Sequence, residues 1–196
     1  MKTKRLPESD LRCIKEIDSS FEIEQYLDYT KKKFEDKYVF EMKLVKHPRP
    51  FRKCFSHYDD AYMKMLSSFV KEGGSFQISE NRKCVALAIT QCHQWNRTLQ
   101  IWEFLVDKEY RGRKLGKLLM QKVFDYGREK GMRSVFVETQ TNNVKAVRFY
   151  DRMGFAVAGF DDCFYSNRDI ENTEVALVMR KSINNNAAHD SLKQID

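Results

Sequence analysis

The feature that most constrains the fold of this chain is a strand, a basic loop and a helix that follow one another directly. Residues 101–106 have the composition of a strand, and residues 115–130 place apolar side chains on one face of a helix. The loop between them, DKEYRGRKLGK, contains two glycines and leads into a helix N-terminus, where backbone N–H groups are free to bind an anion. A unit of this kind is typical of an α/β protein and indicates a phosphate-binding loop.

The distribution of charge agrees with an anion site at this loop. The chain carries 35 Lys and Arg against 28 Asp and Glu, a formal net charge of +7. Residues 108–152 hold twelve basic and five acidic residues, so the whole excess lies in that segment. A solvated helix face with incidental charge is the alternative reading, and a nucleic-acid surface is a second one. Because the charge coincides with the loop, we expect no nucleic-acid partner.

Several classes of protein are disfavoured by what the chain lacks. The loop has neither G-x-x-x-x-G-K-[ST] nor G-x-G-x-x-G, which argues against ATP and NAD. Five scattered cysteines form no C-x-x-C pair and the four histidines lack partners, so we expect reduced thiols and no metal. The longest apolar stretch has five residues, far below the about 20 that a membrane-spanning helix needs. With polar residues after its basic start, the chain is expected to be cytoplasmic.

The remaining patterns predict one domain over residues 1–183, followed by a disordered tail at 184–196. We expect a short helix within residues 1–38, with the three lysines at 31–33 as its solvated end. A strand at 39–45 is expected to end at the stiff loop HPRPF. A helix capped by Ser56, with Tyr58 and Tyr62 among the residues of its apolar face, is expected to run to Gly73. A hairpin at 76–79 and 85–90, strands at 99–106, 133–139, 155–160 and 174–181, and a helix between Asn143 and Gly154 complete the prediction.

Two motifs carry a resemblance to a known family. The run Arg111-Gly112-Arg113-Lys114-Leu115-Gly116 resembles R/Q-x-x-G-x-G/A, the acetyl-CoA pyrophosphate motif of the GNAT acetyltransferases. Residues 143–155, NVKAVRFYDRMGF, are similar to the family's N-x-x-A-x-x-F-Y-x-x-x-G-F signature at the expected distance. Lys114 departs from the motif because it replaces the first glycine, where a positive φ costs energy for any other residue. Its ammonium is a candidate phosphate ligand.

The resemblance extends to a subgroup of that family. The stretch at 138–155 followed by GFDDCFYSN, together with DSSFE and WNR upstream, resembles the streptothricin acetyltransferases, which implies antibiotic resistance as the role. The implied fold is the α/β GNAT fold, a mixed and mostly antiparallel central sheet with splayed strands and flanking helices. The implied function is transfer of acetyl from acetyl-CoA to a primary amine of a small molecule such as a streptothricin, by a monomer or homodimer. A protein, peptide or polyamine acceptor and a non-catalytic acyl-CoA sensor remain alternatives.

The resemblance also implies where acetyl-CoA binds, in a cleft where residues 101–106 and 133–139 splay apart. The backbone of Leu105 and Val106 is expected to pair with the pantetheine, and the amides from Arg111 to Lys117 to hold the pyrophosphate. The charged side chains of this loop are either phosphate ligands or solvated residues. Asn143 either bonds the pantetheine or caps its helix. The implied cofactor-binding residues are Leu105, Val106, Arg111, Gly112, Arg113, Lys114, Leu115, Gly116, Lys117, Asn143, Ala146, Phe149 and Tyr150.

Catalytic roles follow from the chemistry of acetyl transfer to an amine. Tyr150 matches the family tyrosine, and a phenol of pKa about 10 can protonate a thiolate whose conjugate acid has a pKa of about 8.5. It is otherwise a core aromatic. Glu103 or Glu138 is the candidate base for the acceptor ammonium, unless these carboxylates only face solvent. Glu138, Asp161, Asp162 and Tyr165 are expected to bind a cationic acceptor by charge pairing and cation–π contact, with a plain acidic hairpin as the alternative.

Overall fold

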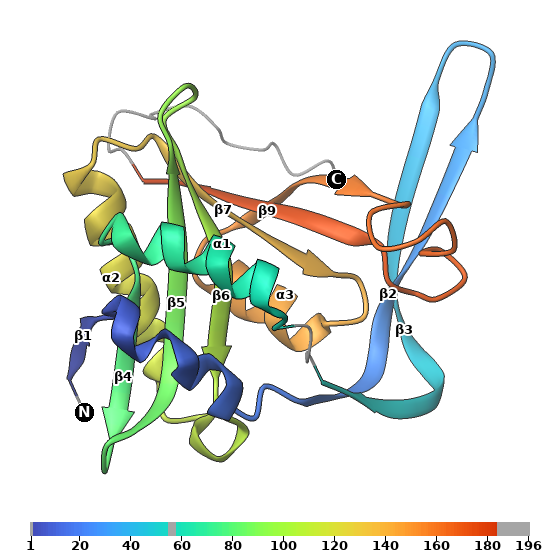
Figure 1. Ribbon diagram of the computed structural model, residues 1–196. Helices are drawn as coiled ribbons and strands as arrows, with labels where there is room; N and C mark the ends of the chain where they lie inside the picture. Colours follow the sequence, from blue (N-terminus) through green and yellow to red (C-terminus); the bar gives the residue numbers. More distant parts are fainter. Residues whose placement is uncertain (1, 55–57, 184–196) are drawn as a thin grey trace.

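The computed structural model describes residues 2–54 and 58–183 (Figure 1). A seven-stranded sheet has the order β1-β4-β5-β6-β7-β9-β8. Its strands are β1 (Thr3–Arg5), β4 (Phe76–Glu80), β5 (Lys83–His93), β6 (Thr98–Val106), β7 (Ser134–Gln140), β8 (Ala156–Asp161) and β9 (Ala176–Ser182). Every neighbouring pair is antiparallel except β6 and β7, which are parallel. The expected mixed, mostly antiparallel sheet is confirmed.

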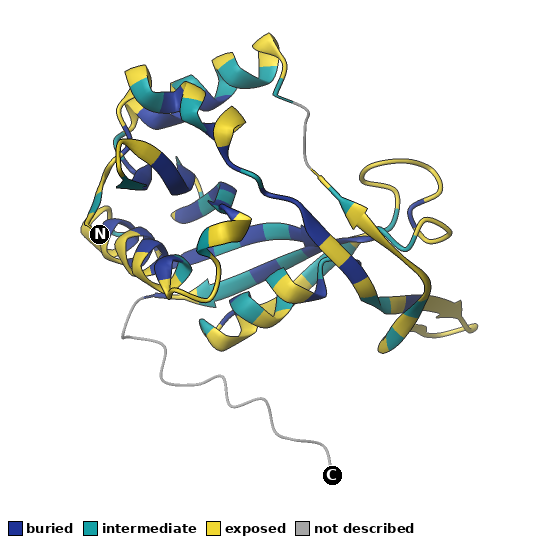
Figure 2. Ribbon diagram, turned by 90° about the horizontal axis from the view of Figure 1, so that it is seen from below, coloured by how far each residue is buried: buried dark blue, intermediate teal, exposed yellow. Residues whose placement is uncertain are grey.

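Helices cover both faces of this sheet. The helical segments are η1 (Glu8–Glu16, 3₁₀), α1 (Asp60–Lys71), η2 (Lys108–Tyr110, 3₁₀), α2 (Leu115–Glu129) and α3 (Val144–Arg152). Alternate residues of β5 divide between two apolar cores: Ala86 and Ala88 pack with α2 on one face, and Leu87 and Ile89 with η1 and α1 on the other. Figure 2 shows buried segments, in dark blue, in the strands and along the helices of the body of the molecule. Strand β5 is therefore buried on both sides, as its continuous apolar run requires.

The parallel pair β6 and β7 stays together over only part of its length. Thr98 to Ile101 pair with Ser134 to Val137, and no pairing follows beyond Ile101 among the described residues. A register shift between Ile89 and Thr90 of β5 bends β6 at the same level. The two strands consequently separate toward their C-terminal ends, as the resemblance implied. This separation positions the site.

A long two-stranded ribbon projects from the body and corrects the prediction for the first 53 residues (Figures 1 and 2). It consists of β2 (Phe21–Lys33) and β3 (Tyr38–Lys53). The lysines at 31–33 end a strand and not a helix, and β3 continues through HPRPF instead of stopping there. The prolines are tolerated because the register shifts between Ile23 and Gln25, so that residues 47–50 need no ladder hydrogen bonds. Only η1 corresponds to the predicted helix.

Most of the remaining elements lie where the patterns placed them. The β4–β5 hairpin turns at Asn81 and Arg82, both with positive φ, which is the backbone of a two-residue turn that matches strand twist. Helix α3 begins after Asn143, whose side chain accepts a hydrogen bond from the Ala146 N–H. Helix α1 is capped by Asp59, which accepts from the Tyr62 N–H. The predicted cap Ser56 and the predicted tail at 184–196 lie outside the described residues.

Candidate active site

A cavity of about 630 Å³ lies beside the splayed end of β6, between the start of α2 and helix α3. It is lined by every residue expected at the cofactor except Arg113. The lining also includes residues that the motifs did not indicate: Ser19, Phe21, Phe104, Tyr110, Lys145, Arg152 and Met153. The structure thus brings together two segments, residues 104–117 and 143–153, that are separated by a helix and a strand.

The loop before α2 exposes the positive end of that helix to the cavity. Gly112 and Lys114 both have left-handed backbones, with φ of 79° and 63°. Within the described chain no side chain caps α2, and its first turn contains no acidic residue. The first N–H groups of the helix have no intrahelical acceptor and remain available to an anion. These groups fit a diphosphate.

The charged side chains of this loop do different things. Arg111 donates from Nε to the Val106 carbonyl at 3.1 Å and from Nη1 to the Ser20 carbonyl at 2.7 Å. Arg113 lies over the Tyr110 ring, 4.7 Å from its centroid. Only Lys114 and Lys117 remain as cations of this loop that line the cavity without such a contact in the part of the chain described. Arg111 therefore holds the loop through these two hydrogen bonds, and its expected charge contribution to the phosphates stays a prediction.

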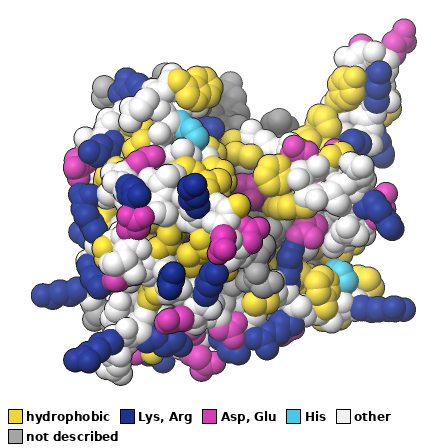
Figure 3. Space-filling model, in the orientation of Figure 1, with side chains coloured by type: hydrophobic (Ala, Val, Ile, Leu, Met, Phe, Trp, Pro, Cys, Tyr) yellow, Lys and Arg dark blue, Asp and Glu magenta, His cyan; other side chains and the backbone are white. Residues whose placement is uncertain are grey.

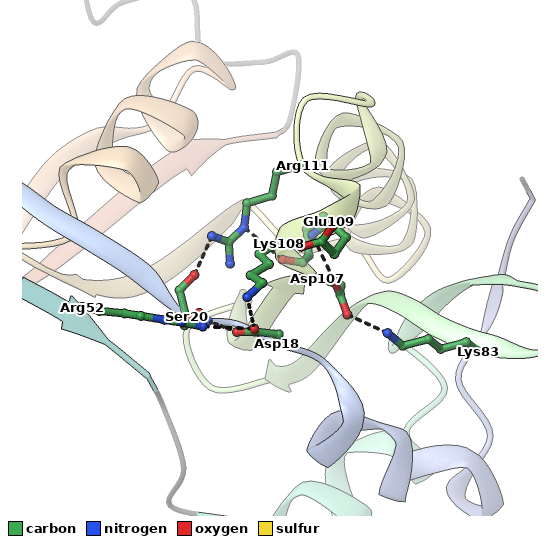
Figure 4. Close-up of polar contacts among 9 residues, drawn as sticks. Asp18, Ser20, Arg52, Lys83, Asp107, Lys108, Glu109 and Arg111 are labelled. Carbon is green, nitrogen blue, oxygen red and sulfur yellow. Dashed lines mark hydrogen bonds and ion pairs between the residues drawn. The ribbon is translucent and has the colours of Figure 1, made fainter.

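Arg111 belongs to a polar network that fastens residues 18–20 to this loop (Figure 4). Asp18 accepts from Lys108 at 2.9 Å and from Arg52 at 3.2 Å. Hydrogen bonds from Ser20 and from Lys108 hold the pKa of its carboxyl well below the usual range. Arg52 also donates to the Ser20 hydroxyl. Since Ser19 and Phe21 both line the cavity, the network fixes one of its walls. No short motif marks this network, because its members come from three distant segments.

Gly116 and Phe149 set how closely α2 approaches α3. A Cβ on Gly116 would lie 3.1 Å from the Phe149 ring, closer than ordinary van der Waals contact. Asn143 holds the start of α3 by accepting from the Ala146 N–H at 3.2 Å. The capping role predicted for Asn143 is therefore present, and the side chain still lines the cavity.

Tyr150 sits at the inner wall of the cavity. Its side chain is 5% exposed and packs against the rings of Phe104, Phe149 and Phe155. Burial and the nearby Glu138 and Glu103 carboxylates raise the pKa of its phenol. Within the described residues no hydrogen bond to the hydroxyl is found. A phenol with a raised pKa stays protonated at neutral pH, which is the state that a proton donor requires.

Two carboxylates on the splayed strands share an environment with Tyr150. Glu103 on β6 is 9% exposed and accepts from the hydroxyls of Tyr62 at 2.9 Å and Tyr58 at 3.4 Å. Burial raises the pKa of Glu103 to about 7, against the opposing effect of these hydrogen bonds. Glu138 on β7 accepts from the Tyr165 hydroxyl, and burial raises its pKa, which the Lys53 charge opposes. Both glutamates are thus held by tyrosines and not simply solvated.

The structure completes this acidic region with residues that the sequence did not indicate. Tyr58 and Tyr62 were assigned to the apolar face of a helix, and Lys53 lay beyond the predicted strand. Lys53 forms an ion pair with Glu174 and lies close enough to Glu138 to influence its pKa. A signal was present in the tyrosines, because two phenols at i and i+4 can turn to one polar partner. In Figure 3 acidic and apolar side chains gather in the middle of the face, between the ribbon and the body.

Asp161 and Asp162 are engaged elsewhere. Asp162 pairs with Lys31 of the ribbon at 2.6 Å, which lowers the pKa of its carboxyl. Asp161 accepts from the Cys163 N–H at 2.9 Å in a local turn. Of the four residues expected at the acceptor, the structure joins Glu138 and Tyr165, and it ties Asp162 to the ribbon.

The residues that the structure describes contain no group of three or more His, Cys, Asp or Glu side chains that could hold a metal ion. None of their helices is both long and apolar enough to cross a membrane.

Comparison with known proteins identifies the family. The model of the acetyltransferase (GNAT) family matches residues 28–155, more than half of the chain. The chain belongs to the GNAT family. Membership confirms the resemblance drawn from the two motifs and the class of enzyme that it implied, an acetyl-CoA-dependent N-acetyltransferase.

Relatives within the GNAT family include proteins that act on streptothricin. A streptothricin acetyltransferase of Streptomyces lavendulae is 36% identical over 85 residues, which cover 43% of this chain and 44% of that protein. Streptothricin acetyltransferase A of Bacillus subtilis is 30% identical over 125 residues, which cover 63% of this chain and 70% of that protein. The match to the first relative thus spans less than half of its length. The subgroup resemblance is confirmed, while the acceptor is a separate question.

A solved structure supports the GNAT fold over nearly the whole chain. A Bacillus anthracis protein named for streptothricin acetylation, solved in complex with acetyl coenzyme A, aligns with a TM-score of 0.72 at 23% identity. The alignment covers 92% of this chain and 98% of that one. At this identity the likeness establishes the fold.

Proposed function

We propose that this GNAT protein transfers the acetyl group of acetyl-CoA to a primary amine of a streptothricin-like antibiotic. The observation that carries the proposal is that Tyr150 lies between the cofactor cavity and the acidic region of Glu103 and Glu138. Its buried, protonated phenol lines the cofactor cavity and also lies within the electrostatic reach of Glu103 and Glu138. A proton donor and a candidate base therefore flank the point where the two strands separate.

Bound acetyl-CoA supplies an acetyl thioester. Glu103 takes a proton from the acceptor ammonium: an N–H bond breaks, its electron pair stays on nitrogen, and a carboxyl O–H bond forms. The neutral nitrogen then attacks the thioester carbonyl, so that a C–N bond forms and the C–S bond breaks, and Tyr150 gives its proton to the departing thiolate. The acetylated nitrogen loses its second proton to the Tyr150 phenolate, which leaves a neutral amide, a thiol and a phenol, and Glu103 returns its proton to solvent. Near neutral pH, Glu103 is available as a carboxylate to accept a proton, and Tyr150 is a neutral phenol that can donate one.

The backbone of β6 supplies the polarising group. The Asp107 N–H bonds to the Val85 carbonyl on the β5 side, so by strand alternation the Val106 N–H points to the side that β7 has left. Arg111 holds the Val106 carbonyl, which belongs to the next peptide unit, and so restrains the backbone on the C-terminal side of this N–H. A fixed N–H at this place is suited to polarise a thioester carbonyl.

The acceptor side favours a cationic amine. Two buried carboxylates, each with a raised pKa, attract an ammonium that neutralises them on binding. Tyr58, Tyr62 and Tyr165 surround them with aromatic faces, which also attract cations. The names of the two relatives support a streptothricin as the compound that carries this amine.

The test is mass spectrometry of a streptothricin after incubation with acetyl-CoA and the purified protein. We expect one added acetyl group, and Tyr150→Phe to lower turnover roughly 100-fold or more while acetyl-CoA affinity stays nearly unchanged. Tyr126→Phe is the matched control, since its buried hydroxyl contacts only structural partners away from the cavity. Normal turnover of Tyr150→Phe would remove that residue from the mechanism.

The acceptor is tested separately from the chemistry. If acetyl-CoA binds but streptothricin gains no acetyl group, the same assay is repeated with spermidine and with a peptide that has a free N-terminus. Acetylation of either would keep the reaction and replace the acceptor. Binding of acetyl-CoA with no acetylation of any amine would favour a non-catalytic acyl-CoA sensor.

A further inference from the structure

The carboxylate of Glu103 is held by two side chains that lie about forty residues before it in the chain. Its Oε1 accepts from the Tyr62 hydroxyl at 2.9 Å and its Oε2 from the Tyr58 hydroxyl at 3.4 Å. With one phenol on each oxygen, the orientation of this buried carboxylate is fixed in both its rotation and its depth in the site.

The fold fixes the two tyrosines before any acceptor arrives. Asp59 caps α1 and accepts from the Tyr62 N–H at 2.8 Å, so Tyr62 occupies the first turn of that helix. Tyr58 precedes it by four residues, and the two ring centroids lie 6.2 Å apart. Farther along α1, Leu66 and Phe69 are buried in the core beneath β5 and β6. Packing and capping therefore fix the position of both hydroxyls whether or not an acceptor is bound.

We propose that Tyr62 is a positioning residue, assisted by Tyr58. It holds the Glu103 carboxylate ionised and oriented to accept a proton from the acceptor ammonium. The inference rests on the proposed function, in which Glu103 is the base. It assigns a functional reason to two tyrosines whose helical spacing alone indicated only core packing.

The charged and titratable groups around Glu103 explain why such support is needed. Tyr58 and Tyr62 face it from the start of α1, Glu138 from β7, and Tyr150 shares its field from α3. Burial and the Glu138 charge favour the protonated carboxyl, and the two phenol hydrogen bonds oppose them. Loss of the Tyr62 hydroxyl leaves Oε1 without its shorter hydrogen bond, so the protonated form gains and the pKa of Glu103 rises.

A direct titration tests the proposal without any acceptor. The protein is labelled with ¹³C at glutamate carboxyl groups, and Glu103→Gln identifies the Glu103 resonance by its disappearance. We expect Tyr62→Phe to raise the titration midpoint of Glu103 by about one pH unit, and Tyr58→Phe by less because its hydrogen bond is longer. Tyr126→Phe, which removes another buried tyrosine hydroxyl, is expected to leave the midpoint unchanged.

Kinetics give a second readout that a merely structural tyrosine would not move. In Tyr62→Phe the acidic limb of kcat/KM shifts to higher pH by the same amount as the titration midpoint, while acetyl-CoA affinity is retained. An unshifted Glu103 midpoint in a folded Tyr62→Phe protein would overturn the proposal. If that variant does not fold, Tyr58→Phe carries the same test. A shifted midpoint in a protein that acetylates no amine would uphold the positioning role and reject the proposed function.

Discussion

The two halves of the site differ in how their residues are distributed along the chain. The cofactor cavity draws most of its wall from two runs, residues 104–117 and 143–153. The proposed acceptor side takes Tyr62 from α1, Glu103 from β6, Glu138 from β7 and Tyr165 from the segment after β8. The first half is therefore a local structure presented by two helix starts, whereas the second exists only after the sheet has formed.

The halves also differ in which atoms carry the chemistry. On the cofactor side these are backbone N–H groups at the uncapped start of α2, whose position hardly depends on side-chain identity. On the acceptor side they are carboxylates and phenols whose charge depends on burial. Substitutions on the cofactor side should thus change the affinity for acetyl-CoA, whereas substitutions on the acceptor side should change the rate and its pH dependence.

The largest expected effect lies in the acceptor half. Glu103→Gln removes the base but keeps the shape and both phenol partners, so we expect kcat to fall by roughly 10²- to 10⁴-fold while acetyl-CoA affinity is unchanged. In the unmodified protein kcat/KM should rise with pH through about 7, since the carboxylate is the active form and exists above its pKa. This limb should vanish in the variant.

Glu138→Gln is the matched control for the choice of base. It alters the same acidic region, but its partner Tyr165 holds it on the other strand. We expect a higher KM for the amine with the pH limb retained. If Glu138→Gln lost the rise of kcat/KM with pH and Glu103→Gln kept it, Glu138 would be the base and Glu103 would serve acceptor binding.

The contrast between the halves also explains what could be predicted from sequence. The strand, loop and α2 are adjacent in the chain, so periodicity and the Gly112–Gly116 spacing located them, and Asn143 marked α3. The mixed, mostly antiparallel sheet was implied by the family resemblance and not by any pattern, and the order of its seven strands was not predicted. The role of Tyr62 was not predicted because its spacing from Tyr58 and Leu66 fits the apolar face of a helix. Its contact with Glu103 exists only once the sheet has formed.

The ribbon shows a second kind of limit. Strand β2 exposes many side chains, so neither alternation nor apolar content distinguished it from a helix. The strand predicted at 39–45 lies within β3, but the two prolines interrupted the pattern and hid its continuation to Lys53. The pairing of the two strands is set by the register shift opposite residues 47–50, which is a tertiary outcome. The loop-holding contact of Arg111 was not predicted for the same reason, because its carbonyl partner on Ser20 lies 91 residues away.

An intermediate effect is expected where the halves are joined. Arg111→Ala removes both hydrogen bonds that tie the loop to Val106 and Ser20, and should lower the free energy of unfolding by about 1–2 kcal/mol and weaken acetyl-CoA binding. Arg113→Ala deletes a charge two residues away that only stacks on Tyr110. Chemical denaturation and calorimetry of both variants separate the cases. If both variants lost the same free energy of unfolding and the same acetyl-CoA affinity, Arg111 would contribute only a positive charge to the loop.

The smallest expected effect concerns Lys114, where backbone strain and charge act together. Its φ of 63° disfavours any side chain, so Lys114→Gly should raise the free energy of unfolding by up to about 1 kcal/mol, whereas Lys114→Ala keeps the Cβ and should not. Both variants remove the same ammonium from the cavity wall. Both should therefore weaken acetyl-CoA binding equally at low salt, and less as added salt screens the charge. Unchanged affinity at low salt in both would show that the left-handed backbone, and not the charge, is what this position contributes to the cofactor half.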